Sequence, residues 1–429
     1  MKKTKFAAIL SLGMVPALFW SSESSAIPSW ARKYNVSCYM CHSGFPQRNA
    51  VGEAFQANGF RFAGATEEAL TKQKNIKIGN DEWKKSPNAP FTGSFPQFDP
   101  LSMTLGGNLI NYTAPQTNRT TGASTGKVFN WTAPNTVSMF YGGSLGDNIT
   151  FFGQIGGIGA ASTAVSSNAK VVLMLSPGFN FSMGTNFSAS GWNGSGAGGV
   201  VNVSNLLPAP NNYAELQFTR GETAGYSIVG GASVGAPPLT ATAANEINDM
   251  VYLRAKAKLL GAGMLSGANG TLGNSYNGLD NQVTVGLGLS SAKKNIFTGN
   301  YVGETFIWGG DVQGVYNNAL VGLAASRDQD LNLTNVRGDA GYFIYPWLFA
   351  KISYNNIAAH TTANALSGLN FRQPTITPSV VAWVAPNVSV TATYTTYTKG
   401  WKESAAVGTT LANNLSNQNT FRLAFSAGF

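Results

Sequence analysis

Two cysteines and a histidine stand together near the start of the chain, in the order Cys38, Cys41, His42. A C-x-x-C pair followed at once by histidine is the attachment site of a c-type haem. The two thiols add across the porphyrin vinyl groups, and the adjacent imidazole binds the iron on its proximal side. The chain has only two cysteines and two histidines in 429 residues, so this clustering is informative. The motif predicts one covalent haem c, attached to Cys38 and Cys41, with His42 as the proximal ligand.

Other uses of the motif have less support from the surrounding residues. A redox dithiol is typical of a βαβ context, and a structural zinc site needs four ligands. A structural disulfide would make the adjacent His42 a coincidence. The residues that a dithiol or a zinc site would need do not accompany Cys38 and Cys41, so we retain the haem interpretation.

A short helix is predicted directly after the motif. Asn49 can cap its start, and the helix then runs from Ala50 to Ala57. Asn58-Gly59 ends it, because glycine tolerates the left-handed conformation of a helix end. A module of this size has little core of its own, so we expect the covalent haem to serve as core.

Two residues of this helix are candidates for the haem wall. Val51 and Phe55 share one helix face at i, i+4 spacing. We expect both to line the porphyrin, with three further aromatic residues nearby: Trp30, Phe45 and Phe60. Ordinary core packing of a small domain is the alternative for each of them.

The sixth iron ligand is not evident from the sequence. No methionine lies between Cys41 and Asp99, so the nearby methionine loop of soluble cytochromes c is missing. Met103 is the nearest downstream candidate for the distal position. His360 is far off in the chain, where we expect an external loop without a role, and an open or water-bound site is also possible.

The first residues predict export. Met1 to Ala26 has a lysine-rich start, an apolar middle and a small-residue cleavage site, which is the pattern of a secretory signal peptide. The apolar run contains Pro16 and is too short for a comfortable membrane anchor. We therefore expect a signal peptide at 1–26, a haem module and linker at 27–96, and a second domain at 97–429. The linker is polar and rich in lysine from Glu67 to Pro96, with a possible helix from Glu67 to Lys74.

The composition of the remaining chain is typical of a transmembrane β-barrel. The sequence has 50 glycines and only 11% charged residues, whereas a soluble domain has about 25%. No apolar run long enough for a helical membrane span follows the signal. A lipid-facing exterior with small and polar turns and lumen explains these features. A secreted soluble β-sandwich or propeller is the alternative.

Alternating segments define the barrel more closely. We expect about 16 strands, an even number as bacterial outer-membrane barrels require. Their predicted starts are Leu101, Thr136, Asn148, Lys170, Phe179, Tyr213, Tyr226, Met250, Gln282, Glu304, Leu320, Asn335, Trp347, Pro374, Asn387 and Asn419.

Loop lengths and the last strand agree with this topology. Tight turns such as 145–148, 176–178 and 316–319 alternate with long connections, and short turns face the periplasm in such barrels. The connection from Gly261 to Asn281 is long where a short one is expected, which leaves the register there in question. The final strand alternates and ends on Phe429, like the C-terminal signal of outer-membrane proteins.

Several classes of function lack the residues they need. The net charge is +9 without a basic stripe, so no nucleic-acid partner is expected. Two histidines leave no room for a Ser/His/Asp set, and the Gly-x-Gly pieces within 153–159 are strand glycines and not nucleotide loops. No catalytic residues are expected beyond the haem.

The haem module also carries a family resemblance. The segment from Ile27 to His42 resembles the start of the fused monohaem cytochrome-porins of iron-oxidising bacteria, as do Phe45-Pro46, Gly52, Phe55 and Asn58-Gly59-Phe60. The order of signal peptide, one C-x-x-C-H, linker and barrel is similar too. That family usually has an aromatic residue and Gln-Thr-Gly before the first cysteine, where this chain has Tyr34-Asn35-Val36.

The resemblance implies an outer-membrane oxidoreductase of the iron:cytochrome c type. Such a protein oxidises extracellular Fe(II) at its single haem c and passes the electron to a periplasmic c-type cytochrome or cupredoxin, while outer-membrane lipid surrounds the barrel. Two alternatives remain open. One is a haem conduit for another extracellular donor or acceptor, and the other is a diffusion porin with a haem plug or sensor.

Overall fold

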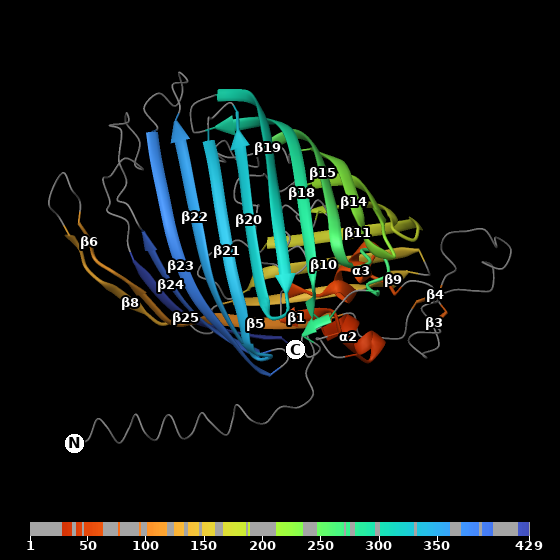
Figure 1. The fold of residues 1–429 in the computed structure, drawn as a ribbon, viewed down its shortest axis with the longest axis horizontal. Coiled ribbons are helices and arrows are strands. Elements are labelled where there is room, and N and C mark those ends of the chain that lie inside the picture. The colour runs from red at the N-terminus through yellow and green to blue at the C-terminus, as the bar shows by residue number, and fades with distance from the viewer. Residues whose placement is uncertain are drawn as a thin grey trace.

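The computed structural model of the chain describes most of the barrel and a large part of the N-terminal module (Figure 1). The described residues are 28–36, 40–44, 47–62, 76–77, 94–95, 101–117, 124–132, 136–145, 148–158, 166–185, 188, 212–234, 247–269, 272–274, 279–296, 301–329, 333–360, 370–385, 388–397 and 419–428. The predicted signal peptide, the predicted helix from Glu67 to Lys74, Cys38, Phe45 and Phe429 lie outside them.

Within these residues, sixteen long strands form a closed antiparallel barrel, which confirms the predicted fold class. Each predicted strand start falls within one of these strands or immediately before it. The strands are β5 (Leu101–Thr113), β9 (Thr136–Leu145), β10 (Ile149–Ile158), β11 (Ser166–Ser176), β12 (Phe179–Thr185), β13 (Asn212–Arg220), β14 (Thr223–Val234), β15 (Ile247–Ala262), β18 (Gln282–Ile296), β19 (Tyr301–Tyr316), β20 (Ala319–Asp328), β21 (Leu333–Tyr345), β22 (Leu348–His360), β23 (Asn370–Ala385), β24 (Val388–Tyr397) and β25 (Thr420–Gly428).

The last strand closes the barrel against the first. β25 pairs with β5 from Gly428↔Thr104 to Thr420↔Thr113, and β5 pairs with β9 on its other side. The short β8 (Val128–Asn130) pairs with the loop end of β5. Closure leaves no strand edge unpaired in the ring, as the hydrocarbon interior of a membrane requires.

Connections at one end of the barrel, the turn end, are mostly two- or three-residue turns. The long connection from Gly261 to Asn281 also lies at this end, so the predicted register is correct and the extra length is real. It contains the short strands β16 (Leu272–Asn274) and β17 (Leu279–Asp280). Two further short hairpins are formed by β3 (Ile76–Lys77) with β4 (Ser94–Phe95) and by β6 (Gln116–Thr117) with β7 (Ser124–Thr125).

Side chains alternate between an apolar exterior and a polar lumen. On β18, Leu287 and Leu289 point outward and are exposed, whereas Thr284 and Ser290 are buried on the lumenal face. Alternation of this kind is the signature of an outer-membrane barrel, whose outer face meets lipid. Without reference to any other protein, it identifies the chain as an outer-membrane β-barrel.

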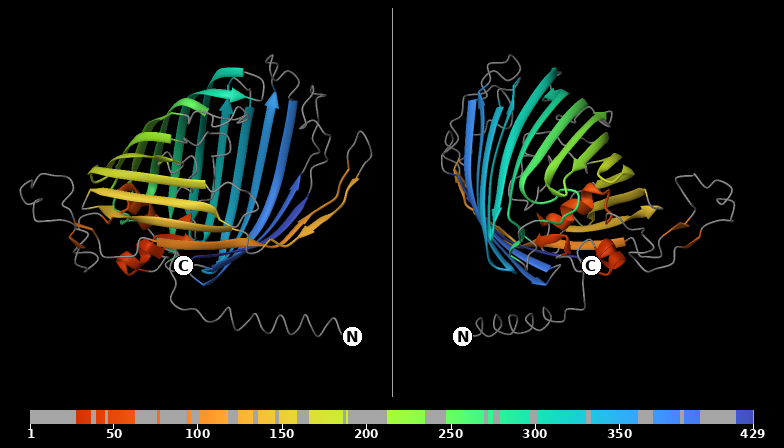
Figure 2. Two further views of the ribbon diagram at one scale, coloured as in Figure 1. Left: turned by 180° about the vertical axis from the view of Figure 1, so that it is seen from behind. Right: turned by 45° about the vertical axis from the view of Figure 1, so that its right-hand side comes forward.

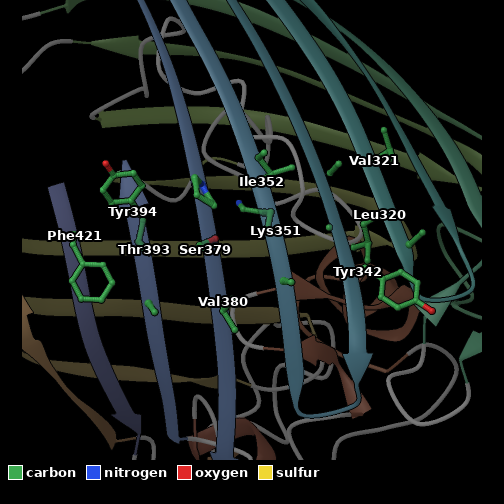
Figure 3. Close-up of a pocket in the computed structure, with 16 residues that line it drawn as sticks. Leu320, Val321, Tyr342, Lys351, Ile352, Ser379, Val380, Thr393, Tyr394 and Phe421 are labelled. Atoms are coloured by element: carbon green, nitrogen blue, oxygen red, sulfur yellow. The ribbon is translucent and has the colours of Figure 1, made fainter. Parts of the chain in front are cut away.

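The outer face has a hollow of about 630 Å³ (Figure 3). Its walls are mainly outward-facing apolar side chains from β20 to β25. The large ones are Val321, Tyr342, Ile352, Val380, Tyr394 and Phe421. Small residues such as Ala340 and Ala350 form its floor. The large side chains around the hollow belong to the exterior apolar face.

Several ion pairs lie on the lumenal wall. Lys170 lies 3.2 Å from Glu215, Lys258 lies 3.0 Å from Asp280, and Arg254 pairs with Asp311. All of these side chains are almost fully buried, and a buried charge is stable only when it is paired. These buried charges of the lumenal wall are thus neutralised by partners on nearby strands.

An apolar cluster covers a different part of the lumenal wall. It joins buried residues of β19 to β23 with Leu279 of β17: Ile307, Val315, Leu320, Ala324, Phe343, Phe349 and Trp383. Phe343 stacks against Trp383 with ring centroids 6.0 Å apart. This cluster gives the lumen a hydrophobic core near the turn end, which the alternation pattern alone does not predict.

The N-terminal module lies in the turn end of the barrel (Figure 2). It consists of α2 (Pro28–Tyr34), α3 (Ala50–Ala57) and a two-stranded hairpin of β1 (His42–Gly44) and β2 (Gln47–Arg48). Its contacts include lumenal residues of β9 to β12 and β15 and the connection after β15, described below. None of the described helices has the length and apolar character needed to cross a membrane.

Candidate haem site

The described part of the C-x-x-C-H motif lies at the start of the small hairpin. Cys41 occupies a turn and is half-buried, and His42, also half-buried, opens β1. His42 pairs with Arg48 of β2. Cys41 and His42 are thus adjacent on a short, constrained segment, while Cys38 lies outside the described residues.

Asn49 joins this segment to α3. Its backbone N–H donates to the carbonyl of Cys41 at 3.0 Å, and its side-chain amide donates to the carbonyl of Met40 at 3.1 Å. Its side-chain oxygen accepts from Gly52 N at 3.0 Å, which is the predicted helix cap. The sequence predicted the cap but not the two bonds to the motif, because capping residues are local signals and these bonds depend on the hairpin.

Gly52 brings α3 into direct contact with the motif. A Cβ at this position would overlap the carbonyl oxygen of Cys41, so only glycine allows this approach. The predicted end of the helix is also confirmed, since Asn58 caps it and Gly59 has φ +67°. A glycine in the interior of a short helix was the sequence signal for this contact.

Aromatic rings pack beside α3. Phe55 is buried among Trp30, Tyr34 and Phe62, with ring centroids 5.1 to 5.8 Å from its own. Trp30 also stacks on Phe60 at 4.8 Å. This cluster brings Phe55, Trp30 and Phe60 together. Val51 is half-buried and faces Gly267 of the long connection. The roles of Val51 and Phe55 as a haem wall remain predictions.

The barrel wall holds the module through specific polar bonds. Lys33 donates to Ser144 Oγ at 2.6 Å, and the guanidinium of Arg61 donates to Ile149 O at 3.0 Å. The amide of Asn180 donates to the carbonyl of Ala57 at 2.6 Å. Trp30 adds a stacked contact with Phe152 of β10 at 5.4 Å. Several strands therefore fix the module from one side of the lumen.

A buried carboxylate sits between the module and β15. Glu53 of α3 lies 3.4 Å from Lys256. Burial alone would raise the pKa of Glu53, but the positive charges of Lys256, Lys258 and Arg48 outweigh it and hold the pKa below its ordinary value. Burial lowers the pKa of Arg48, and Glu53 partly offsets this. Glu53 is thus a charged link between module and wall at neutral pH.

The structure does not bring Met103 to the motif. Ser102 pairs with Phe140, which packs with the aromatic cluster in the lumen, and Met103 pairs with Met139. Directly paired residues share a face and neighbours alternate, so Met103 and Met139 lie on the outer face. Met103 is exposed there, on the face of the wall that points away from the lumen. This outward position argues against the predicted distal role of Met103.

The second histidine also differs from expectation in its position. His360 is the last residue of β22 and pairs with Asn370 of β23. It belongs to a strand end and not to an external loop. Within the described residues, no group of three or more His, Cys, Asp or Glu side chains is arranged to hold a metal ion.

The residues around the motif fit a c-type haem. Cys41 supplies one attachment thiol and His42 an adjacent imidazole, and the aromatic cluster packs on α3, the helix that also contacts Cys41. The indole Nε1 of Trp30 is buried without a hydrogen-bond partner among the described residues. Such a donor is costly unless it is satisfied, and the carboxylates of a haem are acceptors of the kind it lacks.

Comparisons with known proteins give a weak likeness to porins. No family model matches the chain, and no curated protein matches it. An anion-selective porin from Comamonas acidovorans is similar over 77% of this chain and 99% of its own, with 10% identity and a TM-score of 0.46.

Two other solved structures are similar to the same degree. The outer-membrane channel DcaP of Acinetobacter baumannii has 12% identity and a TM-score of 0.48, over 77% of this chain and 96% of its own. OmpF of Salmonella typhi, in complex with daunomycin, also has 12% identity and a TM-score of 0.48, over 77% and 97%. The assignment as an outer-membrane β-barrel rests on the strand pairing and the apolar exterior described above.

Proposed function

We propose that this protein is an outer-membrane electron conduit. It oxidises extracellular Fe(II) at a single haem c and passes the electron to a periplasmic c-type cytochrome or cupredoxin. The observation that supports this proposal is the packing of the C-x-x-C-H segment, through Asn49 and α3, in the turn end of a closed barrel. Short turns face the periplasm in such barrels, and this orientation supports electron transfer from the module to a soluble carrier of that compartment.

The residues of the module have distinct roles in this proposal. Cys38 and Cys41 would attach the porphyrin, and His42 would bind the iron through its imidazole. The bound haem supplies reversible one-electron transfer. Phe55 and Tyr34 keep water from one side of the site by packing together, and Asn49 holds the backbone of Met40 and Cys41 in place.

The reaction needs no acid, base or substrate pocket. Fe(II) loses one electron and becomes Fe(III), and the periplasmic carrier gains that electron, so charge and electrons balance without proton transfer. Outer-sphere transfer from a dissolved ion depends on distance and potential. The absence of a Ser/His/Asp set from the sequence is consistent with this chemistry. We further propose that outer-membrane lipid covers the apolar outer face.

A second candidate function is a diffusion porin with a haem plug or sensor. The closed barrel with a polar, ion-paired lumenal wall favours it, because that wall is typical of a solute channel. A conduit for another extracellular donor or acceptor is a variant of the first proposal with the same haem.

Stopped-flow mixing of the detergent-purified protein with Fe(II) tests these alternatives. The conduit predicts rapid reduction of the haem bands and reoxidation by an added periplasmic cytochrome. Reduction by dithionite but not by Fe(II) would leave the haem and indicate another donor. Absence of haem bands, together with solute flux through reconstituted barrels, would favour a simple porin and refute the conduit.

A further inference from the structure

The connection between β15 and β18 is unusual for the turn end of this barrel. The other described hairpins there, such as the turn at 317–318, have two or three linking residues, whereas this one spans 263–281. We call its described residues, 263–269, 272–274 and 279–281, the strap. The strap has two parts, one bonded to the turn between β13 and β14 and one in the lumen.

The first part of the strap is fixed to the barrel. Met264 N donates to Ala224 O at 2.8 Å and Leu265 N donates to Gly221 O at 3.1 Å. The side-chain amide of Asn269 donates to Glu222 O at 3.1 Å. Met264 and Leu265 are both buried. The strap therefore covers the turn between β13 and β14 through bonds that do not involve the module.

The second part turns into the lumen. Leu279 is 3% exposed and belongs to the apolar cluster on β19 to β23. Asp280 accepts from Ala262 N at 2.6 Å and lies 3.0 Å from Lys258. Asn281 accepts from Asn317 N at 2.7 Å. A buried leucine next to a neutralised ion pair is a packed element and not a solvated loop.

The strap and the module occupy different sides of the lumen. Hydrogen bonds and an ion pair join the module to β9, β10, β12 and β15. Leu279 reaches the opposite wall, β19 to β23. The two meet at α3, where Asn58 donates to Leu265 O at 2.9 Å and a Cβ at Gly267 would lie 3.1 Å from Ala54.

We propose that the strap is a built-in constriction of the lumen. It fills the part of the turn end that the N-terminal module leaves open, so that strap and module together close the barrel to hydrated solutes. A narrow apolar passage tends to lose its water, and hydrated ions then cannot pass through it. Leu279 and the apolar cluster around it form such an apolar surface in the lumen. This inference does not depend on the haem.

Ion conductance across planar lipid bilayers tests the proposal with the full chain. In one variant the residues 264–280 are replaced by Asn-Gly, a preferred two-residue hairpin turn. A second, milder variant is Leu279→Ser. The matched control is Leu289→Ser, which makes the same change on the outer face of the adjoining strand. Each is also measured in a Cys38→Ser, Cys41→Ser background, which lacks the haem attachment sites.

The expected result is a clear order of conductance. The parent and Leu289→Ser have equally low conductance, and Leu279→Ser has a higher one. The strap replacement has the stepwise conductance of an open channel. The order is the same with and without Cys38 and Cys41. A folded strap replacement with the conductance of the parent would overturn the proposal. If the strap replacement does not form a heat-modifiable barrel, the test rests on Leu279→Ser. A conductance of Leu279→Ser equal to that of Leu289→Ser would then overturn the proposal. Absence of Fe(II) oxidation with unchanged conductance results would count against the proposed electron conduit but not against the proposed constriction.

Discussion

The N-terminal module and the barrel are built by different means. In the module, single residues carry several contacts, as Asn49 does by capping α3 and holding the backbone at Met40 and Cys41. In the barrel, the alternation of outward apolar and inward polar side chains repeats over sixteen strands. Outward residues such as Leu287 and Leu289 need only be apolar. The structure of the module therefore depends on particular hydrogen-bonding atoms, whereas the structure of the barrel depends on a repeated pattern of residue types.

The largest expected effect separates the two regions completely. His42→Ala removes the proposed proximal ligand, so we expect all Fe(II)-dependent reduction of the haem to be lost while the barrel still inserts. Absorbance spectra report the first quantity, and heat-modifiable migration in gels reports the second. Cys38→Ala is expected to behave in the same way. A variant whose barrel also failed to assemble would contradict the separation.

The barrel's own weak point is a buried ion pair. Arg254→Met leaves Asp311 charged and unpaired on the lumenal wall, which is expected to destabilise the barrel by about 3–5 kcal/mol. Urea unfolding in detergent, followed by tryptophan fluorescence, measures the change. The double variant with Asp311→Leu is the control, because replacing both charges restores most of the stability. Equal destabilisation in both variants would exclude the unpaired charge as the cause.

A smaller substitution sharpens the comparison within the module. Gly52→Ala introduces a Cβ that overlaps the carbonyl of Cys41, and overpacking of this kind costs about 1–3 kcal/mol. We expect a lower yield of haem-loaded protein with no change in barrel unfolding. Gly314→Ala is the matched control, since a Cβ there meets nothing within 4 Å. Equal haem loading in the two variants would show that α3 does not support the motif.

The smallest expected effect concerns the junction of the two regions. The pKa of Glu53 is held below its ordinary value near 4.5, so its contribution to docking is fully present above that value. The contribution is lost as the pH falls through the lowered pKa. Proteolysis of the module by a protease that is active in acid, corrected at each pH for its activity on an unfolded substrate, is expected to increase as the pH falls, because docking buries Lys33 and Arg61.

Glu53→Gln provides the control for this pH dependence. The amide cannot titrate, so the variant should show the same corrected cleavage at each pH. A Glu53→Gln protein with the pH response of the parent would assign the response to another group. The Lys256→Met variant removes the nearest positive charge, and we expect it to move the release of the module to higher pH.

Much of the fold follows from local signals in the sequence. Alternation located the sixteen strands, including the doubtful pair on either side of Gly261 to Asn281, because each strand must bury one face and expose the other. The helix from Ala50 to Ala57 was equally predictable, since Asn49 and Asn58-Gly59 mark its ends. The adjacency of Cys41 and His42 needs no tertiary contact, because it follows from their order in the chain.

Long-range contacts were not predictable in the same way. The outward position of Met103 depends on its pairing with Met139 in β9, and the bond from Asn58 to Leu265 joins residues 207 positions apart. Neither contact could be predicted from neighbouring residues, because a methionine in a strand and an asparagine at a helix end are both common. The strap was visible only as a connection of the wrong length.

The sequence by itself determined the haem motif, the helix after it and the alternating strands, because spacing and periodicity act over a few residues. Only the tertiary structure decided that α3 lies in the lumen, that Glu53 meets Lys256 and that Leu279 fills the opposite side. Closing the ring brings distant strands within reach of one another, and the contacts inside it follow from that closure.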